Sequence, residues 1–251
     1  MHKIGCRWDA EKLLDLQAAG EPGSPVVDLQ PGLQRQGLTL LLPAQRLPGR
    51  PGLTAGQRLL AARDDNGLWA RLPASSAAAK PVYRNTSRWL APSADDTLLS
   101  LKYAKSWRAG AAGAQGYRRA VGHLLELVPQ RDPLTLKVGE LLPVQVLLQG
   151  QPLAGAGVEL SDLVTKLPED RITRYTTDAQ GAAHLPLRAR SIHMLGVDLE
   201  RPNDGSLGEG PRSLPVDKLL LVATYTFVRQ AAWIKLNACA PPCRRQWPPA
   251  P

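Results

Sequence analysis

The sequence predicts a mostly β protein built from two β-rich units, of which the second is an antiparallel β-sandwich. Two observations predict this class. The 251 residues include 23 prolines and 22 glycines spread along the chain, and such frequent turn residues favour short strands over long helices. In the second half, short apolar runs recur between turn residues at the spacing typical of sandwiches. The longest continuous apolar run is only Leu219–Ala223, so we expect no transmembrane segment.

The formal net charge of +9 is unevenly distributed along the chain. Residues 27–106 sum to +6 and residues 230–251 to +3, whereas residues 133–229 sum to −1. A basic balance is typical of proteins that bind nucleic acid or an anionic membrane. The arginines of the basic half stand singly between leucines instead of clustering. We therefore expect a solvated basic face and no nucleic-acid partner.

These shifts in composition and charge predict five segments. They are a helical or loose N-terminal segment at residues 1–26, a first β-rich domain at 27–105, a Gly/Ala-rich linker at 106–121, a β-sandwich domain at 122–229 and a Pro/Arg-rich disordered tail at 230–251. The boundary near residue 110 rests on a stretch rich in glycine and alanine without apolar periodicity.

In the first unit we expect one short helix followed by strands. Asp9–Gly20 alternates charge with leucine, which predicts an amphipathic helix capped by Asp9 and ended by Gly20. The Asp-Asp-Asn-Gly sequence at 64–67 predicts a hairpin turn, because Asn-Gly tolerates positive φ angles. The expected strands are Leu38–Leu42, Gln57–Ala62, Gly67–Arg71 and Thr97–Ala104.

In the second unit, seven short runs separated by turn residues predict the sandwich. The Asp178–Gly181 segment has Asp first and Gly last, which predicts a four-residue hairpin connection between its flanking strands. Apolar residues of the last run do not alternate cleanly, so its buried face is not assigned. The runs are 123–129, 141–148, 151–160, 171–177, 182–187, 191–199 and 219–228.

The sequence carries no signature of an enzyme, so we expect a non-catalytic protein. No G-x-S-x-G elbow is present, and the glycines at 110–116 lack the Lys-Ser/Thr ending of a phosphate loop. The acidic pair Glu169-Asp170 adjoins Pro168 and Arg171, where solvated loop charge is the ordinary explanation. The cysteines Cys6, Cys239 and Cys243 match neither a disulfide framework nor a zinc site.

Several motifs of the second unit occur in an order that resembles one family. They are Gly122–Pro129, Asp132-Pro133, Leu136–Gly139, Leu142–Val144, Gly150–Ala156 and Thr177–Gly181. From about Tyr103 to Phe227 the chain resembles the DUF4198 family, the NikM-like group of secreted bacterial proteins associated with nickel or cobalt uptake. Parts of the same motifs also resemble transthyretin-like sandwiches, so the expected sandwich is immunoglobulin-like or transthyretin-like.

The resemblance implies a periplasmic or cell-envelope protein that acts as an accessory to metal uptake. Its implied partner is a metal transporter or another envelope protein, and its implied metal is nickel or cobalt. The first residues instead lack the apolar segment of a secretory leader, which predicts a cytoplasmic protein if Met1 is the natural start.

Six side chains of the second unit are candidates for binding such a metal. His184 and His193 fall in consecutive predicted strands, which we expect to bring both imidazoles to one face. Imidazole binds nickel and copper, thioether sulfur favours Cu(I), and carboxylates complete such sites. The candidates are His123, Asp178, His184, His193, Met194 and Asp198.

The alternative function is a structural or adhesive sandwich module that acts without metal. Trp69, Trp89 and Trp107 are its candidate anchors, unless they belong to the core of a chain that has only one phenylalanine. Convergence of three candidate ligands on one point would favour the metal function. Their dispersal together with an exposed apolar patch would favour the interaction module.

Overall fold

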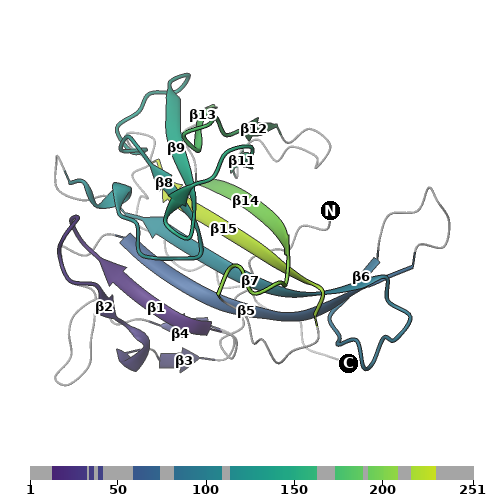
Figure 1. The fold of residues 1–251 in the computed structure, drawn as a ribbon. Coiled ribbons are helices and arrows are strands. Elements are labelled where there is room, and N and C mark those ends of the chain that lie inside the picture. Colours follow the sequence, from purple (N-terminus) through teal and green to yellow (C-terminus); the bar gives the residue numbers. More distant parts are fainter. Residues whose placement is uncertain are drawn as a thin grey trace, which may run out of the picture.

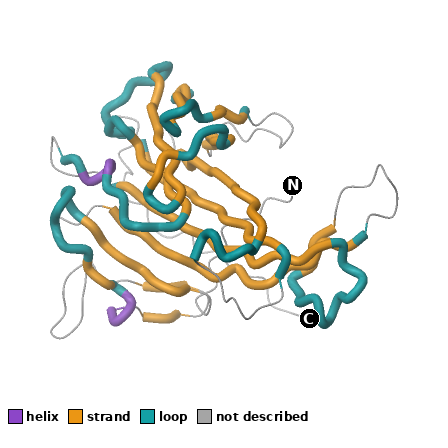
Figure 2. The backbone as a smooth tube through the Cα atoms, viewed as in Figure 1, coloured by secondary structure: helices purple, strands orange, loops and turns teal. Residues whose placement is uncertain are grey.

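The computed structural model describes residues 13–32, 34–36, 39–41, 59–73, 82–108, 114–162, 173–188, 192–208 and 216–229. Strands dominate this part of the chain, which confirms the mostly β class (Figures 1 and 2). The strands are β1 Leu13–Ala19, β2 Val27–Asp28, β3 Gln34–Gln36, β4 Thr39–Leu41, β5 Leu59–Leu72, β6 Val82–Arg84, β7 Asp96–Trp107, β8 Leu125–Pro129, β9 Leu141–Leu148, β10 Gln151–Pro152, β11 Gly157–Asp162, β12 Arg174–Thr176, β13 Ala182–Pro186, β14 Ile192–Pro202 and β15 Lys218–Val228. The 3-10 helices are η1 Gln30–Gly32 and η2 Gly116–Arg118.

The largest sheet joins strands from both halves of the chain. Its order is β12-β11-β14-β15-β7-β5-β1-β2, and β6 pairs with β5. β15 runs parallel to β7, with Lys218 opposite Leu98 and Phe227 opposite Trp107, whereas the other pairings of this sheet are antiparallel. The predicted first and second units therefore share one mixed sheet.

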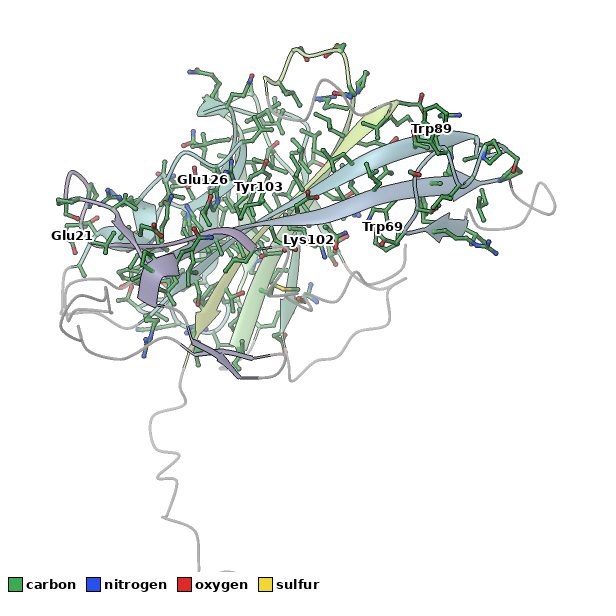
Figure 3. The ribbon with its side chains drawn as sticks, turned by 90° about the horizontal axis from the view of Figure 1, so that it is seen from below. Glu21, Trp69, Trp89, Lys102, Tyr103 and Glu126 are labelled. Atoms are coloured by element: carbon green, nitrogen blue, oxygen red, sulfur yellow. The ribbon has the colours of Figure 1, made fainter. Side chains whose placement is uncertain are left out.

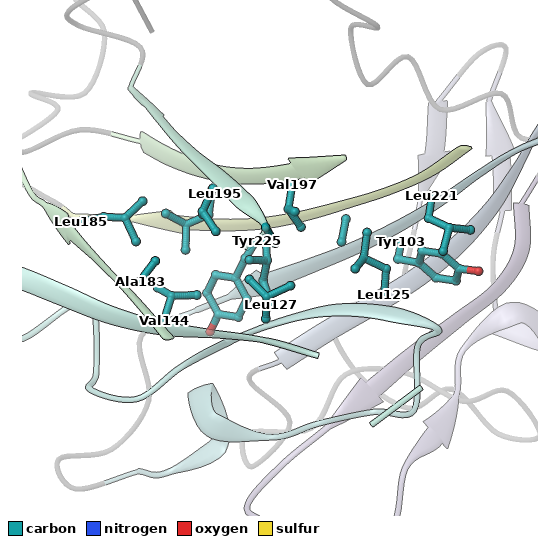
Figure 4. Packing of buried hydrophobic residues seen from close by; sticks show 14 of the residues in the cluster. Tyr103, Leu125, Leu127, Val144, Ala183, Leu185, Leu195, Val197, Leu221 and Tyr225 are labelled. Atoms are coloured by element: carbon teal, nitrogen blue, oxygen red, sulfur yellow. The ribbon is translucent and has the colours of Figure 1, made fainter. Parts of the chain in front are cut away.

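A second, antiparallel sheet packs on the large one and completes a sandwich. It consists of β9 between β8 on one side and β10 and β13 on the other. Alternate residues of β7, β14 and β15 face alternate residues of β8, β9 and β13, and their apolar side chains form the core (Figure 4). Its largest fully buried side chains include Tyr103, Tyr225 and Phe227.

The predicted N-terminal helix is wrong, because residues 13–19 form strand β1. β1 pairs with β5 in antiparallel register, with Ala19 opposite Leu59, and Ala18 and Ala19 are fully buried. Backbone pairing along one side of β5 outweighs the weak helical preference of this segment. The predicted start of the helix at Asp9 lies outside the described residues.

The predicted hairpin at 64–67 is also wrong, because β5 runs continuously through it. The register shifts between Asp65 and Gly67, which is the mark of a β-bulge. Gly67 has a φ of 84°, and the Asp65 side chain accepts a hydrogen bond from its backbone N–H. The long strand β7 supplies partners on both sides of the bulge, so the turn residues kink one strand instead of reversing the chain.

Six of the seven strands predicted in the second unit are confirmed, with the 141–148 strand at its expected bounds. The predicted run 151–160 instead divides into β10 of the small sheet and β11 of the large one. The connection at Asp178–Gly181 differs from the expectation. β12 pairs with β11 in the large sheet and β13 with β9 in the small one. The turn therefore carries the chain from one layer of the sandwich to the other and closes no hairpin. Residues 171 and 172 lie outside the described part.

The region predicted as a linker is largely part of the fold. Ser106 and Trp107 complete β7, and Tyr117 of η2 is buried in the core. Residues 109–113, together with the predicted tail at 230–251, lie outside the described residues. Both helices in the described part are single turns of three residues, and neither has the length needed to cross a membrane.

Candidate functional site

The two imidazoles expected on one face lie in different sheets. His184 belongs to β13 of the small sheet, where its neighbours Ala183 and Leu185 face the core and its own side chain is exposed. His193 belongs to β14 of the large sheet, is fully buried and stacks on Phe227 with ring centroids 5.1 Å apart. The prediction that neighbouring strands bring them together is wrong, because the chain changes sheets between β13 and β14.

The other candidates on β14 point away from His193. Met194 and Asp198 lie on the opposite face of the strand, since side chains alternate along it. Asp198 accepts a hydrogen bond from Arg174 at 3.1 Å, and Arg174 also pairs with Glu159 at 2.7 Å. Burial raises the pKa of Asp198, and this ion pair opposes the shift. Asp198 therefore belongs to an ion-pair network that links β12, β11 and β14.

Asp178 and His123 have structural surroundings of their own. The Asp178 carboxylate accepts the backbone N–H groups of Gln180 and Ala182, both at 2.9 Å, and so shapes the turn between the sheets. His123 lies just before β8, is 8% exposed and contacts the Tyr103 ring with centroids 5.3 Å apart.

The described residues contain no group of three or more His, Cys, Asp or Glu side chains able to hold a metal ion. The six predicted ligands thus do not converge in that part of the chain. The donors fit isolated structural roles better than a nickel or cobalt centre, which needs several ligands about 2 Å from one point.

A buried polar cluster that the sequence analysis missed lies between the two sheets. Lys105 of β7 and Glu126 of β8 form an ion pair at 2.7 Å, and each side chain is 2% exposed. Lys105 Nζ also donates to the Arg119 carbonyl at 2.9 Å, and Glu126 Oε1 accepts the Val121 N–H at 2.7 Å. Glu126 stands between two leucines and Lys105 between Ala104 and Ser106, so the sequence gives no signal of such a pair.

The electrostatics of this cluster set the protonation of His123. Burial lowers the pKa of His123 to about 4, with Glu126 opposing the shift and Lys105 and Arg63 adding to it. Burial also lowers the pKa of Lys105, and Glu126 opposes that shift. His123 is therefore neutral at pH 7, and its Nε2 has no hydrogen-bond partner among the described residues. A base this weak is poorly suited to proton abstraction at neutral pH.

The tryptophans considered as surface anchors have three different environments. Trp107 is 2% exposed and belongs to the core, with its indole N–H donated to Asp132 at 3.2 Å. Trp69 is half-buried on β5 and donates to the Asn66 carbonyl at 3.1 Å. Trp89 is 84% exposed, and the adjacent Leu90 is 81% exposed. Figure 3 shows Trp89 at one end of the molecule, with Glu21 at the other.

We call the segment from β6 to the turn at Ser87–Ala91 the tip. The carbonyl of Ser87 accepts backbone N–H groups of Leu90 and Ala91, both at 3.1 Å. Arg88 forms an ion pair with Asp217, which also accepts the backbone N–H of Thr97 at 2.8 Å. Beneath the turn, Ala91 and Ala94 pack on Ala70 of β5. The turn is therefore fixed to β5 and to Asp217, just before β15, while two large apolar side chains face solvent.

Comparison with known proteins places the chain in one family. No curated protein and no solved structure matches it. A family model with the description "Domain of unknown function (DUF4198)" matches residues 34–201, which is more than half of the chain. The match begins in the basic first unit, at β3, and so extends well before Tyr103, where the motif resemblance starts. The chain therefore belongs to the DUF4198 family.

Proposed function

We propose that this protein is a non-catalytic interaction module of the cell envelope, and that the tip is its contact surface. The observation that carries this proposal is the pair Trp89 and Leu90, two large apolar side chains more than four-fifths exposed on a fixed turn. Exposing such side chains costs solubility, and a contiguous apolar protrusion is typical of binding surfaces. A turn fixed before contact also loses little conformational entropy on binding.

The described surroundings of the polar side chains support a non-catalytic function. The buried cluster holds an ion pair, a neutral histidine of low pKa and the Tyr103 ring, but no serine or cysteine nucleophile. Lys105 is engaged by both Glu126 and the Arg119 carbonyl, so it is held as a structural cation. This arrangement stabilises the contact between β7 and β8.

The nickel or cobalt role implied by the resemblance has less support than the interaction module. Such a metal would be the cargo of the uptake system, and a protein that hands it on needs at least a transient set of ligands. Within the part of the chain that the structure describes, His193 is buried in the core, whereas His184 is exposed on the outer face of the small sheet. The envelope location proposed here rests on the family resemblance.

Photo-crosslinking of the full chain in cells tests the proposed contact surface. Trp89 is replaced by p-benzoylphenylalanine, and Leu141, which is 49% exposed on β9, is replaced in the matched control. We expect a defined adduct from position 89 and none from position 141, with adducts recovered in the envelope fraction. Adducts that form equally from both positions, or from neither, would contradict the proposal.

A further inference from the structure

We propose that the tip binds the surface of an anionic lipid bilayer, with Trp89 and Leu90 entering its interfacial region. This inference rests on the proposed function, since it names the partner of the same surface. Tryptophan is suited to the membrane interface, because its ring is apolar and its indole N–H can remain hydrated. Leu90, next in the chain, adds apolar area without a polar group to bury.

The strand register adds Val82 and Arg84 to the same face of the tip. Val82 lies opposite Leu72 and Arg84 opposite Ala70 in the β5–β6 pair. Residues directly opposite in an antiparallel pair point to the same face, and Ala70 and Leu72 form the small cluster on which the turn packs. Val82, which is 52% exposed, therefore lies on the side of β5 that carries the turn with Trp89.

The charge of this face suits an anionic surface. Arg84 is exposed and forms no ion pair with any residue that the structure describes. Two of the nearby carboxylates are engaged, since Asp96 pairs with Arg71 and Lys218, and Asp217 pairs with Arg88, whereas Asp95 is exposed. In the sequence, residues 27–106, which include the tip, carry a net charge of +6. Each basic residue near an anionic leaflet strengthens binding, and this contribution weakens with salt.

The shape of the tip favours a bilayer over a protein surface. A stable protein interface covers about 800 Å² on each partner and centres on residues that are surrounded by further contacts. Trp89 and Leu90 instead protrude from a single turn at one end of the molecule (Figure 3). A bilayer accommodates isolated apolar side chains of this kind, because lipids rearrange around them.

Sedimentation with lipid vesicles tests the proposal on the full chain. We expect binding to vesicles of phosphatidylcholine mixed with phosphatidylglycerol, and weaker binding to phosphatidylcholine alone. The Trp89→Ala/Leu90→Ala variant should lose about tenfold or more in affinity, whereas Leu141→Ala should bind like the wild type. Arg84→Glu should weaken binding to anionic vesicles, and Arg188→Glu, which also changes an exposed arginine, should do so less. Circular dichroism confirms that each variant is folded.

Three outcomes would overturn the bilayer proposal. These are absence of vesicle binding by the wild type, equal affinity for neutral and anionic vesicles, and unchanged affinity in the Trp89→Ala/Leu90→Ala variant. Crosslinking then separates the two proposals. A protein adduct from position 89 without vesicle binding contradicts the bilayer partner but leaves the interaction module intact. Absence of any adduct together with absence of vesicle binding contradicts both.

Discussion

Lys105 and Glu126 form a buried ion pair that joins the two layers of the sandwich. Lys105 lies on the central strand β7 of the large sheet, and Glu126 lies on β8 of the small sheet, with Nζ and Oε1 2.7 Å apart. The pair closes a hydrogen-bonded path through the Arg119 carbonyl and the Val121 N–H. This path holds the segment between η2 and β8 against the large sheet.

Removing one partner of this pair should be much more destabilising than removing one partner of a surface pair. We expect Lys105→Met to lower the free energy of unfolding by about 3–5 kcal/mol, because Glu126 remains as an unpaired buried charge. Lys105→Met/Glu126→Gln should be less destabilised than Lys105→Met alone, since the glutamine is neutral and still accepts the Val121 N–H. Urea unfolding of the wild type, Lys105→Met and the double variant measures these differences in the free energy of unfolding.

The exposed pair of Lys218 and Glu200 is the matched control for this experiment. Its atoms are 2.6 Å apart, but the side chains are 32% and 41% exposed. Glu200→Gln should therefore cost less than about 1 kcal/mol. A Lys105→Met variant no less stable than Glu200→Gln would contradict a structural role for the buried pair.

His123 should make the stability of the protein depend on pH between about 4 and 6.5. Its pKa is lowered to about 4 in the folded chain from an ordinary value of 6.5. The unfolded chain therefore binds more protons in this window, and the free energy of unfolding falls as the pH decreases through it. The pKa shift corresponds to a loss of about 3 kcal/mol by pH 4. Urea unfolding at several pH values measures this loss.

The His123→Phe variant separates the part of the pH dependence of stability that is due to His123 from the part that is due to carboxylates. Phenylalanine keeps a ring beside Tyr103 and cannot be protonated, so the variant should lose less stability between pH 6.5 and pH 4 than the wild type. Identical pH profiles for the two proteins would show that His123 does not bind its proton in the way that its burial predicts.

The sequence predicts strands well where each strand uses its own turn residues. The 141–148 strand has its expected bounds, because Gly139 and Gly150, with φ angles of 90° and 74°, delimit it. Prediction from the sequence fails where pairing with a distant strand determines the local structure. Leu13–Ala19 becomes a strand because β5 offers a free side, and Asn66-Gly67 becomes a bulge because β7 continues past it.

Pairing with distant strands also explains why the predicted metal site is wrong. Strands consecutive in the chain were expected to be neighbours, whereas β13 and β14 belong to opposite layers. In the last strand, β15, the buried face was not assigned from the sequence although its residues do alternate. Its odd-numbered residues from Leu219 to Phe227 are all buried, yet Leu220 and Val222 are only half-buried on the other face and obscure the alternation in the sequence. The sequence marks Trp89 as one of three candidate anchors with Trp69 and Trp107, but it does not distinguish the exposed tryptophan from the core one.

Gly181 should tolerate substitution less than any glycine whose surroundings are open. Its φ is 70°, and a Cβ would lie 2.8 Å from the Leu153 nitrogen and 2.9 Å from the Val146 oxygen. Gly150 has a similar φ of 74° but nothing within 4 Å of its Cβ position. We expect Gly150→Ala to cost about 1 kcal/mol from backbone strain alone. Gly181→Ala should cost at least about 2 kcal/mol more, since backbone atoms must shift.

Thermal or urea unfolding of both glycine variants measures this difference. Because the two positions have similar φ angles, the difference between them reports the close approach at the crossing from β12 to β13. Equal destabilisation would mean that the turn at Asp178–Gly181 relaxes freely and does not fix the two layers.

Substitution of the candidate imidazoles should leave metal binding unchanged. His193 is buried against Phe227, and His184 is exposed on the outer face of the other sheet, so neither supplies a ligand to a shared centre. We expect isothermal titrations of Ni²⁺ and Co²⁺ into the full chain to give the same isotherm for the wild type and for His184→Ala. His193→Ala should lower stability, because it leaves a cavity beside Phe227, but should not weaken metal binding in the folded protein. Weaker binding in both single variants would instead support the metal-uptake function and contradict the separation of the two imidazoles.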